Sequence, residues 1–171
     1  MTLEHLWAGW RREYVEEVSS EGESGDCVFC RILASGDPGP DNGIVYRDGT
    51  TSVILNAFPY ATGHVLVMPE RHLSQLDQLT ADESSSLWET ARVAVDVLWE
   101  TYEPDGANLG ANLGRAAGAG IPQHLHLHAL PRWSGDTNFM TAVAGVRVMP
   151  ESLRDTWSKL STTWAKRAQS A

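Results

Sequence analysis

The chain has 171 residues, of which 42% are hydrophobic and 20% charged, the composition of a globular protein with enough length for one well-filled core. Its formal charge of −9 argues against nucleic acid as a partner, because nucleic-acid binding depends on basic patches that neutralise phosphates. No apolar run approaches the roughly 20 residues of a membrane span, and the first residues lack a secretion signal, so we expect a cytoplasmic protein with no membrane partner.

The N-terminal part of the chain predicts two helices joined by a link. Apolar residues recur at three- and four-residue spacing over residues 1–18, which predicts an amphipathic helix. The members of that stripe are Leu3, Leu6, Trp7, Trp10, Tyr14 and Val18. A polar, glycine-containing stretch over residues 19–26 then leads to a short helix expected from Cys27 to Leu33.

A β-hairpin and a third strand are expected next. The strands Gly43 to Arg47 and Thr51 to Asn56 flank Asp48-Gly49, a strong signal for a tight hairpin turn. The following strand, His64 to Pro69, is apolar enough to be buried on both faces. His72 then stands where we expect a helix to begin.

The second half of the chain predicts a long helix, two strands and a final helix. Thr80-Ala81-Asp82-Glu83 is a capping box that opens the long helix, and Pro104-Asp105-Gly106 ends it. The predicted buried stripe of that helix is Leu87, Ala91, Ala94, Leu98 and Tyr102. A strand is expected from Ala107 to Leu113, a small-residue loop from Gly114 to Gly120, and a last helix with Pro150 in its first turn.

Strands and helices do not alternate regularly in this order, so the sequence predicts an α+β fold with a mainly antiparallel sheet and one long central helix. We expect a single domain over residues 1–171. It divides into an N-terminal helix over 1–18, a core over 27–132 and a helical C-terminal extension over 133–171.

Histidine and leucine alternate in one stretch that dominates the sequence. His124, His126 and His128 account for half of the six histidines in the chain. In an extended strand alternate side chains share a face, so three imidazoles would stand in a row about 7 Å apart, with the leucines pointing into a core. Three histidines on one face are typical of metal ligation or of proton and phosphoryl chemistry.

This stretch resembles the signature of the histidine triad (HIT) superfamily, His-φ-His-φ-His-φ-φ, over His124 to Leu130. Other family landmarks occur in the family order: Cys27-Val28-Phe29-Cys30, Asn56, Gly63 to Pro69, His72 and Asn112. The opening Leu6 to Tyr14 and the tail Pro131 to Met140 are similar to the bacterial branch that contains diadenosine tetraphosphate phosphorylases. The resemblance implies a HIT-like fold over nearly the whole chain.

The resemblance also implies a covalent mechanism in which His126 attacks an α-phosphorus of an adenine dinucleotide. A neutral imidazole is a competent nucleophile near pH 7, provided that an acceptor holds its other ring nitrogen. His128, when protonated, would stabilise phosphoryl oxygens or assist the leaving group. His64 would lie close by on a neighbouring strand as a supporting residue. The expected reaction is phosphorolysis of a diadenosine polyphosphate, with hydrolysis of nucleoside phosphoramidates or dinucleotides to AMP as the alternative.

Substrate contacts are expected around this nucleophile. Asn56 occupies the family's ribose-binding position, and the loop before the triad can bring main-chain N–H groups to a phosphate. The full set of expected substrate-binding residues is Asn56, Asn112, Gly118, Gly120, Gln123 and Arg132. Many relatives place Gln or Ser shortly before the triad, where this chain has Gly120-Ile121-Pro122. This departure leaves the acceptor, water or phosphate, open.

The two cysteines form a C-x-x-C pair, which in a reducing compartment indicates a metal clip or a redox pair. The resemblance implies that Cys27, Cys30, His72 and His124 are the ligands of a structural zinc ion, a closed tetrahedral set. No organic cofactor is expected. The alternative is a chance pair of reduced thiols.

Two other functions remain open from the residues alone. His124, His126 and His128 would bind metal in a zinc hydrolase, although three ligands in line suit a tetrahedron poorly. A non-catalytic nucleotide-binding module would not need His126. The family also implies a homodimer, with which the tryptophan-rich terminal helices are compatible.

Overall fold

A five-stranded antiparallel sheet forms the centre of the computed structural model, which describes residues 27–136 and 149–170. The strand order is β1-β2-β3-β5-β4, and every neighbouring pair is antiparallel. The strands are β1 (Ile44–Arg47), β2 (Thr51–Leu55), β3 (Val65–Pro69), β4 (Gly106–Ala111) and β5 (Leu127–Arg132). The predicted α+β class is confirmed, whereas the helix predicted over residues 1–18 lies outside the described residues.

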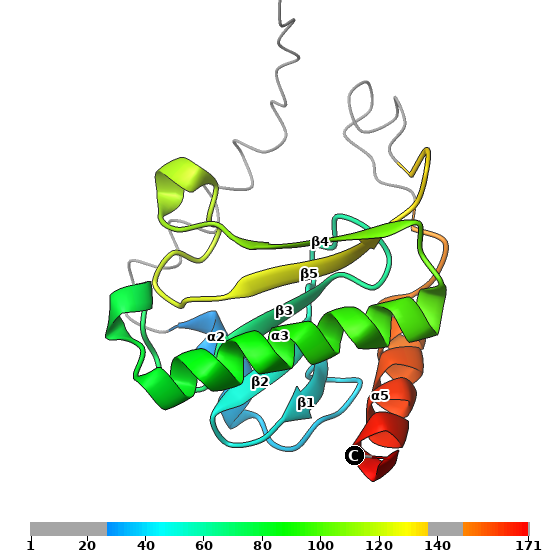
Figure 1. Ribbon diagram of the computed structural model, residues 1–171. Coiled ribbons are helices and arrows are strands. Elements are labelled where there is room, and N and C mark those ends of the chain that lie inside the picture. Colours follow the sequence, from blue (N-terminus) through cyan, green and yellow to red (C-terminus); the bar gives the residue numbers. More distant parts are fainter. Residues whose placement is uncertain (1–26, 137–148, 171) are drawn as a thin grey trace, which may run out of the picture.

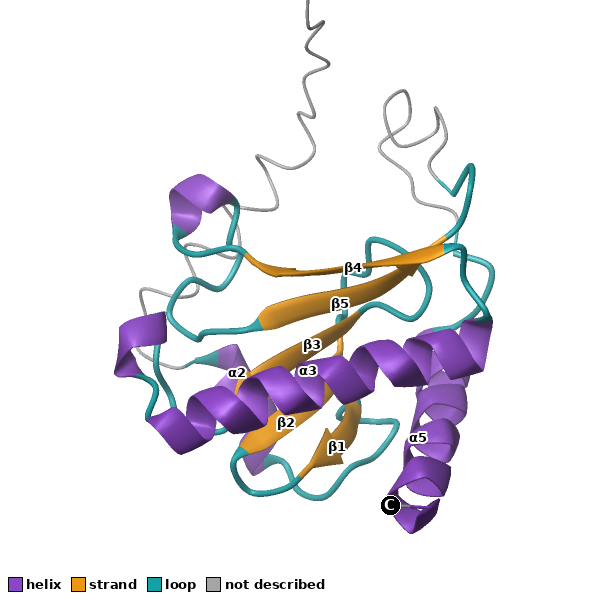
Figure 2. Ribbon diagram, viewed as in Figure 1, coloured by secondary structure: helices purple, strands orange, loops and turns teal. Residues whose placement is uncertain are grey.

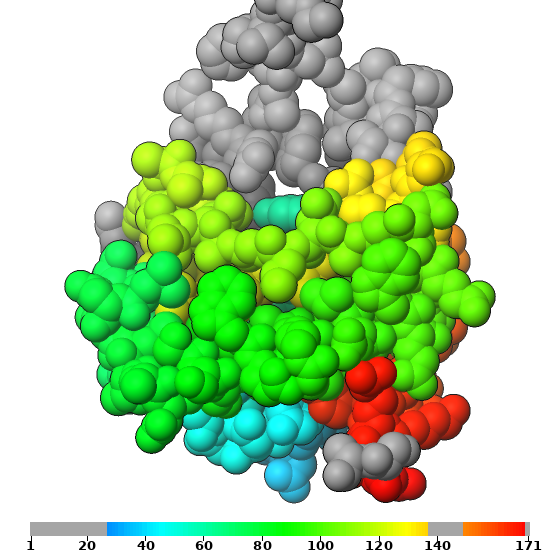
Figure 3. Space-filling model, viewed as in Figure 1, coloured from blue at the N-terminus to red at the C-terminus, as the bar shows by residue number. Residues whose placement is uncertain are grey.

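Helices cover both faces of this sheet. The long helix α3 (Ala81–Tyr102) crosses one face, and the short helix α2 (Val28–Ala34) lies on the other (Figures 1 and 2). The C-terminal helix α5 (Leu153–Ser170) packs against α3 and β1. The space-filling view shows α3 as a green band over the sheet (Figure 3). Two single turns, η2 (Leu76–Gln78) and η3 (Arg115–Ala117), lie in the connections.

The sheet separates two hydrophobic clusters because side chains alternate between its faces. On the α3 side the cluster includes Val65 and Val67, and on the α2 side it includes Leu66 and Met68. The prediction that this strand is buried on both faces is therefore confirmed. Burial of each such side chain is worth about 1.5–3 kcal/mol, so β3 is a firm platform for the residues at its two ends.

The predicted capping box of the long helix is present. The Thr80 hydroxyl accepts a hydrogen bond from the Glu83 N–H, and the Glu83 carboxylate accepts one from the Thr80 N–H. At the other end Glu103 takes a left-handed conformation with φ 45°, directly before Pro104. Both ends of α3 therefore follow from local sequence signals.

The C-terminal helix begins later than the sequence predicts. Pro150 lies outside α5, because the Ser152 hydroxyl accepts a hydrogen bond from the Asp155 N–H and so caps a helix that starts at Leu153. Leu160 and Trp164 are buried against the sheet and α3, as expected for the apolar stripe. None of the described helices is both long enough and apolar enough to cross a bilayer.

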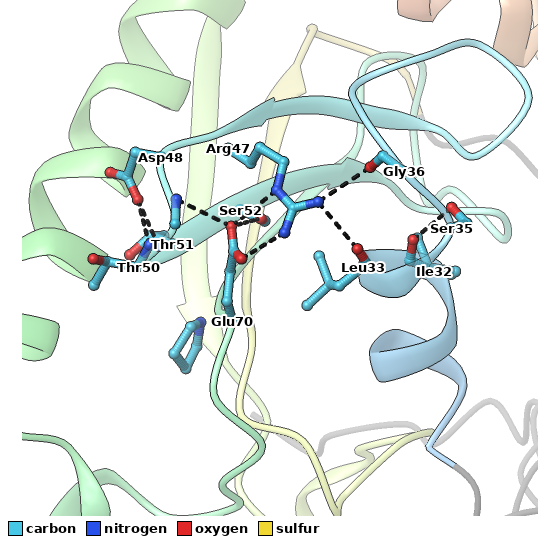
Figure 4. Close-up of polar contacts among 12 residues, drawn as sticks. Ile32, Leu33, Ser35, Gly36, Arg47, Asp48, Thr50, Thr51, Ser52 and Glu70 are labelled. Atoms are coloured by element: carbon cyan, nitrogen blue, oxygen red, sulfur yellow. Dashed lines mark hydrogen bonds and ion pairs between the residues drawn. The ribbon is translucent and has the colours of Figure 1, made fainter.

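The predicted hairpin is stabilised at its turn and tied to α2. The Asp48 carboxylate accepts hydrogen bonds from the N–H groups of Thr50 and Thr51. Arg47 forms a two-pronged ion pair with Glu70 and donates to the main-chain carbonyls of Leu33 and Gly36 (Figure 4). This network joins β1, the end of β3 and the end of α2, and so fixes the chain entering the segment that contains His72.

Replacing Gly63 with alanine should strongly destabilise the fold. Gly63 has φ +80°, and an added Cβ would lie 2.8 Å from Cε2 of Tyr102 and 3.2 Å from Cγ of Pro131. The backbone strain and the overlap together should cost about 2–4 kcal/mol in the free energy of unfolding, measured by urea denaturation. Gly49→Ala is the matched control, since Gly49 has φ +89° with nothing within 4 Å of its added Cβ. Equal losses in both variants would show that the overlap has no effect.

Candidate active site

The histidines divide into two groups, with the triad shared between them. The rings of His126 and His128 lie 5.0 Å apart, and His64, the residue directly before β3, contacts His128 with ring centroids 5.2 Å apart. The side chain of His124 instead faces Cys27, Cys30 and His72. The structure therefore assembles the predicted catalytic and metal-binding sets as two adjacent clusters.

The strand predicted to begin at His124 begins at Leu127 instead. The Leu125 N–H donates to the carbonyl of Leu73 at 2.6 Å, which takes this segment out of the sheet ladder. The predicted row of three imidazoles about 7 Å apart is wrong, because the rings of His126 and His128 lie 5.0 Å apart and His124 faces the cysteines from a segment anchored by a loop.

His126 is held with one ring nitrogen available for attack. Its Nδ1 lies 2.7 Å from the main-chain oxygen of His124, and because that oxygen can only accept, the Nδ1 carries the proton. The Nε2 therefore carries the lone pair. Burial, partly offset by this hydrogen bond, lowers the pKa of His126 below its usual value, so the ring is neutral at pH 7.

A chain of hydrogen bonds assigns the tautomers of the other two imidazoles. The Tyr60 N–H donates to Nδ1 of His64, so Nε2 of His64 carries its proton and donates to Nδ1 of His128 at 3.0 Å. Nε2 of His128 must then carry a proton. This Nε2–H is buried and has no hydrogen-bond partner within the described part of the chain. It is a donor on a ring that lies 5.0 Å from that of His126.

His128 differs from the sequence expectation in its charge. Burial, reinforced by the neighbouring His126, lowers the pKa of His128 to about 4, so the ring is neutral near pH 7 and not an imidazolium. It can still donate a hydrogen bond through Nε2–H.

The free energy of unfolding should decrease as the pH is lowered from 6.5 to 4. The pKa of His128 falls from 6.5 to about 4 on folding, so the unfolded chain binds more protons in this interval and the loss is confined to it. The loss from this residue should be at most about 3 kcal/mol. Urea denaturation at a series of pH values measures it, with His128→Gln as the comparison. A wild-type curve no steeper than that of the variant would contradict the assignment.

Asn56 and Tyr60 surround His64. The Asn56 side-chain nitrogen lies 3.3 Å from His64 Nδ1, which places this predicted ribose-binding residue at the edge of the cluster. The Tyr60 ring lies 4.6 Å from that of His64 and stacks on His128 at 5.8 Å and 17°. Sequence reasoning missed Tyr60. Its only signal was its place four residues before His64 in an aromatic, proline-containing loop.

The glycine-rich loop uses several of its main-chain donors internally. The N–H groups of Ala117, Gly118 and Ala119 donate to Gly114 or Arg115 around the η3 turn. A phosphate contact through the Gly118 N–H would thus compete with the turn. Asn112, Gly120 and Gln123 are each partly exposed, and their substrate contacts stay predictions.

Arg132 is engaged by other protein groups. Its guanidinium forms an ion pair with Asp136 at 2.6 Å and donates to the Asn108 side chain at 2.8 Å. A substrate phosphate would have to compete with the Asp136 carboxylate for it. The predicted contact between Arg132 and the substrate stays a prediction.

Cys27, Cys30, His72 and His124 place one ligand atom each within 4.8 Å of one another. Three of the separations between sulfur and Nδ1 are 3.3, 3.5 and 3.7 Å. A tetrahedral zinc ion with ordinary bond lengths holds its ligand atoms about 3.3–3.8 Å apart, so the residues fit this ion. The His124 Nε2–H donates to the Pro69 carbonyl at 2.9 Å, which leaves Nδ1 free to bind metal.

The alternative in which all three triad histidines bind one ion does not agree with this geometry. Nδ1 of His124 faces the cysteines, while Nδ1 of His126 donates to a carbonyl. Among the described residues, the group that converges is the cysteine–histidine cluster and not the triad.

Comparison with known proteins gives consistent results. Residues 40–135 match the family model described as HIT domain. Over 169 residues the chain is 36% identical to an AP-4-A phosphorylase of Mycobacterium tuberculosis, covering 96% of this chain and 86% of that protein. It is 32% identical over 93 residues to a bis(5'-nucleosyl)-tetraphosphatase [asymmetrical] of Schizosaccharomyces pombe, covering 54% and 50%.

A solved structure agrees with the fold. The crystal structure of a Zn-bound histidine triad family protein from Mycobacterium smegmatis matches with a TM-score of 0.68 and 26% identity, covering 88% of this chain and 99% of that one. The motif, the sheet order and these similarities agree over most of the sequence. The chain therefore belongs to the HIT family.

Proposed function

We propose that this HIT-family enzyme cleaves diadenosine polyphosphates by transferring a nucleotidyl group first to His126 and then to inorganic phosphate. The observation that carries the proposal is the 2.7 Å hydrogen bond from His126 Nδ1 to the His124 carbonyl. It leaves a lone pair on Nε2 of His126, whose ring lies 5.0 Å from that of His128 with its buried Nε2–H. A nucleophile and a donor for the leaving group then face one phosphorus.

In the first step Nε2 of His126 forms a bond to the α-phosphorus, and the bond from that phosphorus to the bridging oxygen breaks. His128 Nε2–H donates to the departing oxygen, and the His124 carbonyl stabilises the imidazolium character that develops on His126. With diadenosine tetraphosphate the leaving group is ATP, and adenosine monophosphate stays bonded to His126.

In the second step an oxygen of inorganic phosphate attacks the same phosphorus and the P–N bond breaks. Adenosine diphosphate leaves and neutral His126 is restored. The similarity to the mycobacterial AP-4-A phosphorylase supports phosphate as the acceptor. The similarity to the yeast tetraphosphatase and the sequence Gly120-Ile121-Pro122 keep water as the second candidate.

Product analysis distinguishes the two acceptors. Diadenosine tetraphosphate is incubated with the enzyme with and without phosphate, and the nucleotides are separated by chromatography. Adenosine diphosphate formed only with phosphate is the expected result. Adenosine monophosphate as the product in both reactions would overturn the phosphorylase proposal in favour of the hydrolase.

A structural zinc ion at the cysteine–histidine cluster is part of the proposal, supported by the fit of the four residues. The zinc would hold α2 and the residues before β5 together; the chemical steps themselves require only side chains and main chain.

We also expect a cytoplasmic homodimer. Strand β4 is an edge strand with Leu109 exposed, and analytical ultracentrifugation tests the dimer.

A further inference from the structure

His124 belongs to both clusters through different atoms. Its side-chain Nδ1 lies 3.5 Å from the sulfur of Cys27 and 3.7 Å from that of Cys30. Its main-chain oxygen accepts the 2.7 Å hydrogen bond that fixes the tautomer and the direction of the His126 ring. Any movement of His124 therefore moves the acceptor that aims the nucleophile.

Phe29 makes a second connection between the two clusters. It lies on α2 between the two cysteines in sequence and is 4% exposed. Its ring packs edge-on against His124 at 5.7 Å and against His126 at 5.1 Å. Phe29 is thus attached to the same helix as Cys30, and its ring packs directly against His126.

The hydrogen bonds of the sheet contribute little to the position of His126, because this residue lies before the first residue of β5. Strand β5 begins at Leu127, one residue after the nucleophile. Before that point the segment is anchored by the Leu125 N–H to Leu73 and by the His124 ring to Pro69, both contacts to the connection around the end of β3. The side chain of Leu125 is buried in the α3-side core, and the cysteine–histidine cluster is a further anchor of this segment.

We propose that the cysteine–histidine cluster, when it holds its ion, is a positioning device for the nucleophile. It acts through the carbonyl of His124 and the ring of Phe29, and so contributes to turnover as well as to stability. This inference rests on His126 being the nucleophile of the proposed function. Neither His72 nor the cysteines touch the reacting atoms, so they are positioning residues.

The expected effect of emptying the cluster falls on kcat and not on KM. A shift of about 1 Å in a reacting group costs on the order of 100-fold in rate. Binding of the nucleotide depends on other residues, so KM should stay within about threefold of wild type.

His72→Ala is the variant that tests the coupling. His72 is exposed and contacts the sulfur of Cys30 and the ring of His124, both inside the cluster. Zinc content is measured by mass spectrometry, kcat and KM with diadenosine tetraphosphate, and the His126 Nδ1–H by proton NMR. We expect loss of zinc, a fall in kcat of about 10- to 100-fold at nearly constant KM, and a broadened or shifted Nδ1–H signal.

Leu160→Ala is the control for a purely structural effect. Leu160 lies on α5 with its side chain buried in the α3-side core, and it belongs to neither histidine cluster, so the variant should lose about 2–5 kcal/mol of stability. Its kcat and its Nδ1–H signal should stay at the wild-type values at a temperature where both variants are folded.

Two results would overturn the inference. One is zinc-free His72→Ala with wild-type kcat and an unmoved Nδ1–H signal. The other, decisive even if that variant does not fold, is a wild-type Nδ1–H signal that is identical in zinc-loaded and zinc-free protein, whereas an unchanged zinc-loaded Phe29→Leu would remove the route through Phe29 alone. If the wild-type protein does not cleave dinucleotides at all, the proposed function fails, and the NMR comparison of zinc-loaded and zinc-free protein alone decides the positioning.

Discussion

Replacing His126 with glycine is expected to lower kcat for diadenosine tetraphosphate by at least about 10⁴-fold, because no other group can form the bond to phosphorus. The Nε2 of this residue is the nitrogen left with a lone pair by the hydrogen bond to the His124 carbonyl. KM should change little. Steady-state kinetics on purified wild-type and variant protein measure the loss.

Free imidazole provides the matched control for this variant. The cavity left by the side chain should admit imidazole, which would attack the same phosphorus and restore part of the activity, while wild-type enzyme should not respond. Rapid quenching at neutral pH with α-labelled substrate should trap a labelled adduct on wild-type protein only. Undiminished turnover by the glycine variant would eliminate the covalent route.

The second large effect is expected for His128→Ala, with a fall in kcat of about 10²- to 10⁴-fold on diadenosine tetraphosphate. The buried Nε2–H of His128 is the donor that the hydrogen bond from His64 creates next to the nucleophile. Without this donor the negative charge that develops on the departing oxygen is not stabilised. Because the residue does not form the bond to phosphorus, the loss should be smaller than for His126.

A substrate with a different leaving group tests whether His128 has this role. Adenosine 5'-phosphate esterified to p-nitrophenol loses a stable anion that needs no donor, so His128→Ala should cleave it with less than about a tenfold loss. His126→Gly should lose activity equally toward both substrates. If His128→Ala is equally slow with both substrates, the residue does not act on the leaving group, and a role in packing or in orienting His126 would replace the proposal.

Local patterns in the sequence predicted most of the fold. The capping box at Thr80 and the turn at Asp48-Gly49 depend on contacts between residues two to three positions apart, so their sequence determines them. The start of the last helix at Leu153 was missed because a serine cap three residues before Asp155 competes with the signal from Pro150. Ser152 and Pro150 are both local start signals, and the helix begins where the Ser152 cap sets it.

The sequence named the residues of the candidate site, but it did not predict how they are arranged. The alternation of His124, His126 and His128 indicated phosphoryl chemistry, and the family landmarks indicated four metal ligands. The structure places the four predicted ligands together, but burial lowers the pKa of His128 to about 4, and Arg132 is paired with Asp136. Burial depends on the packing of the whole fold, which periodicity does not contain, whereas Asp136 lies only four residues from Arg132 and its pairing was missed.

The sequence by itself determined the strands and the long helix, since each rests on spacing along the chain, and its resemblance to the HIT family predicted His126 as the nucleophile. Only the tertiary structure decided the orientation of the lone pair on this residue. It follows from a hydrogen bond to the carbonyl of His124, a residue whose side chain contacts cysteines 94 and 97 residues away in the chain. Contacts between such distant segments form only when both faces of the sheet are packed, so no local pattern predicts them.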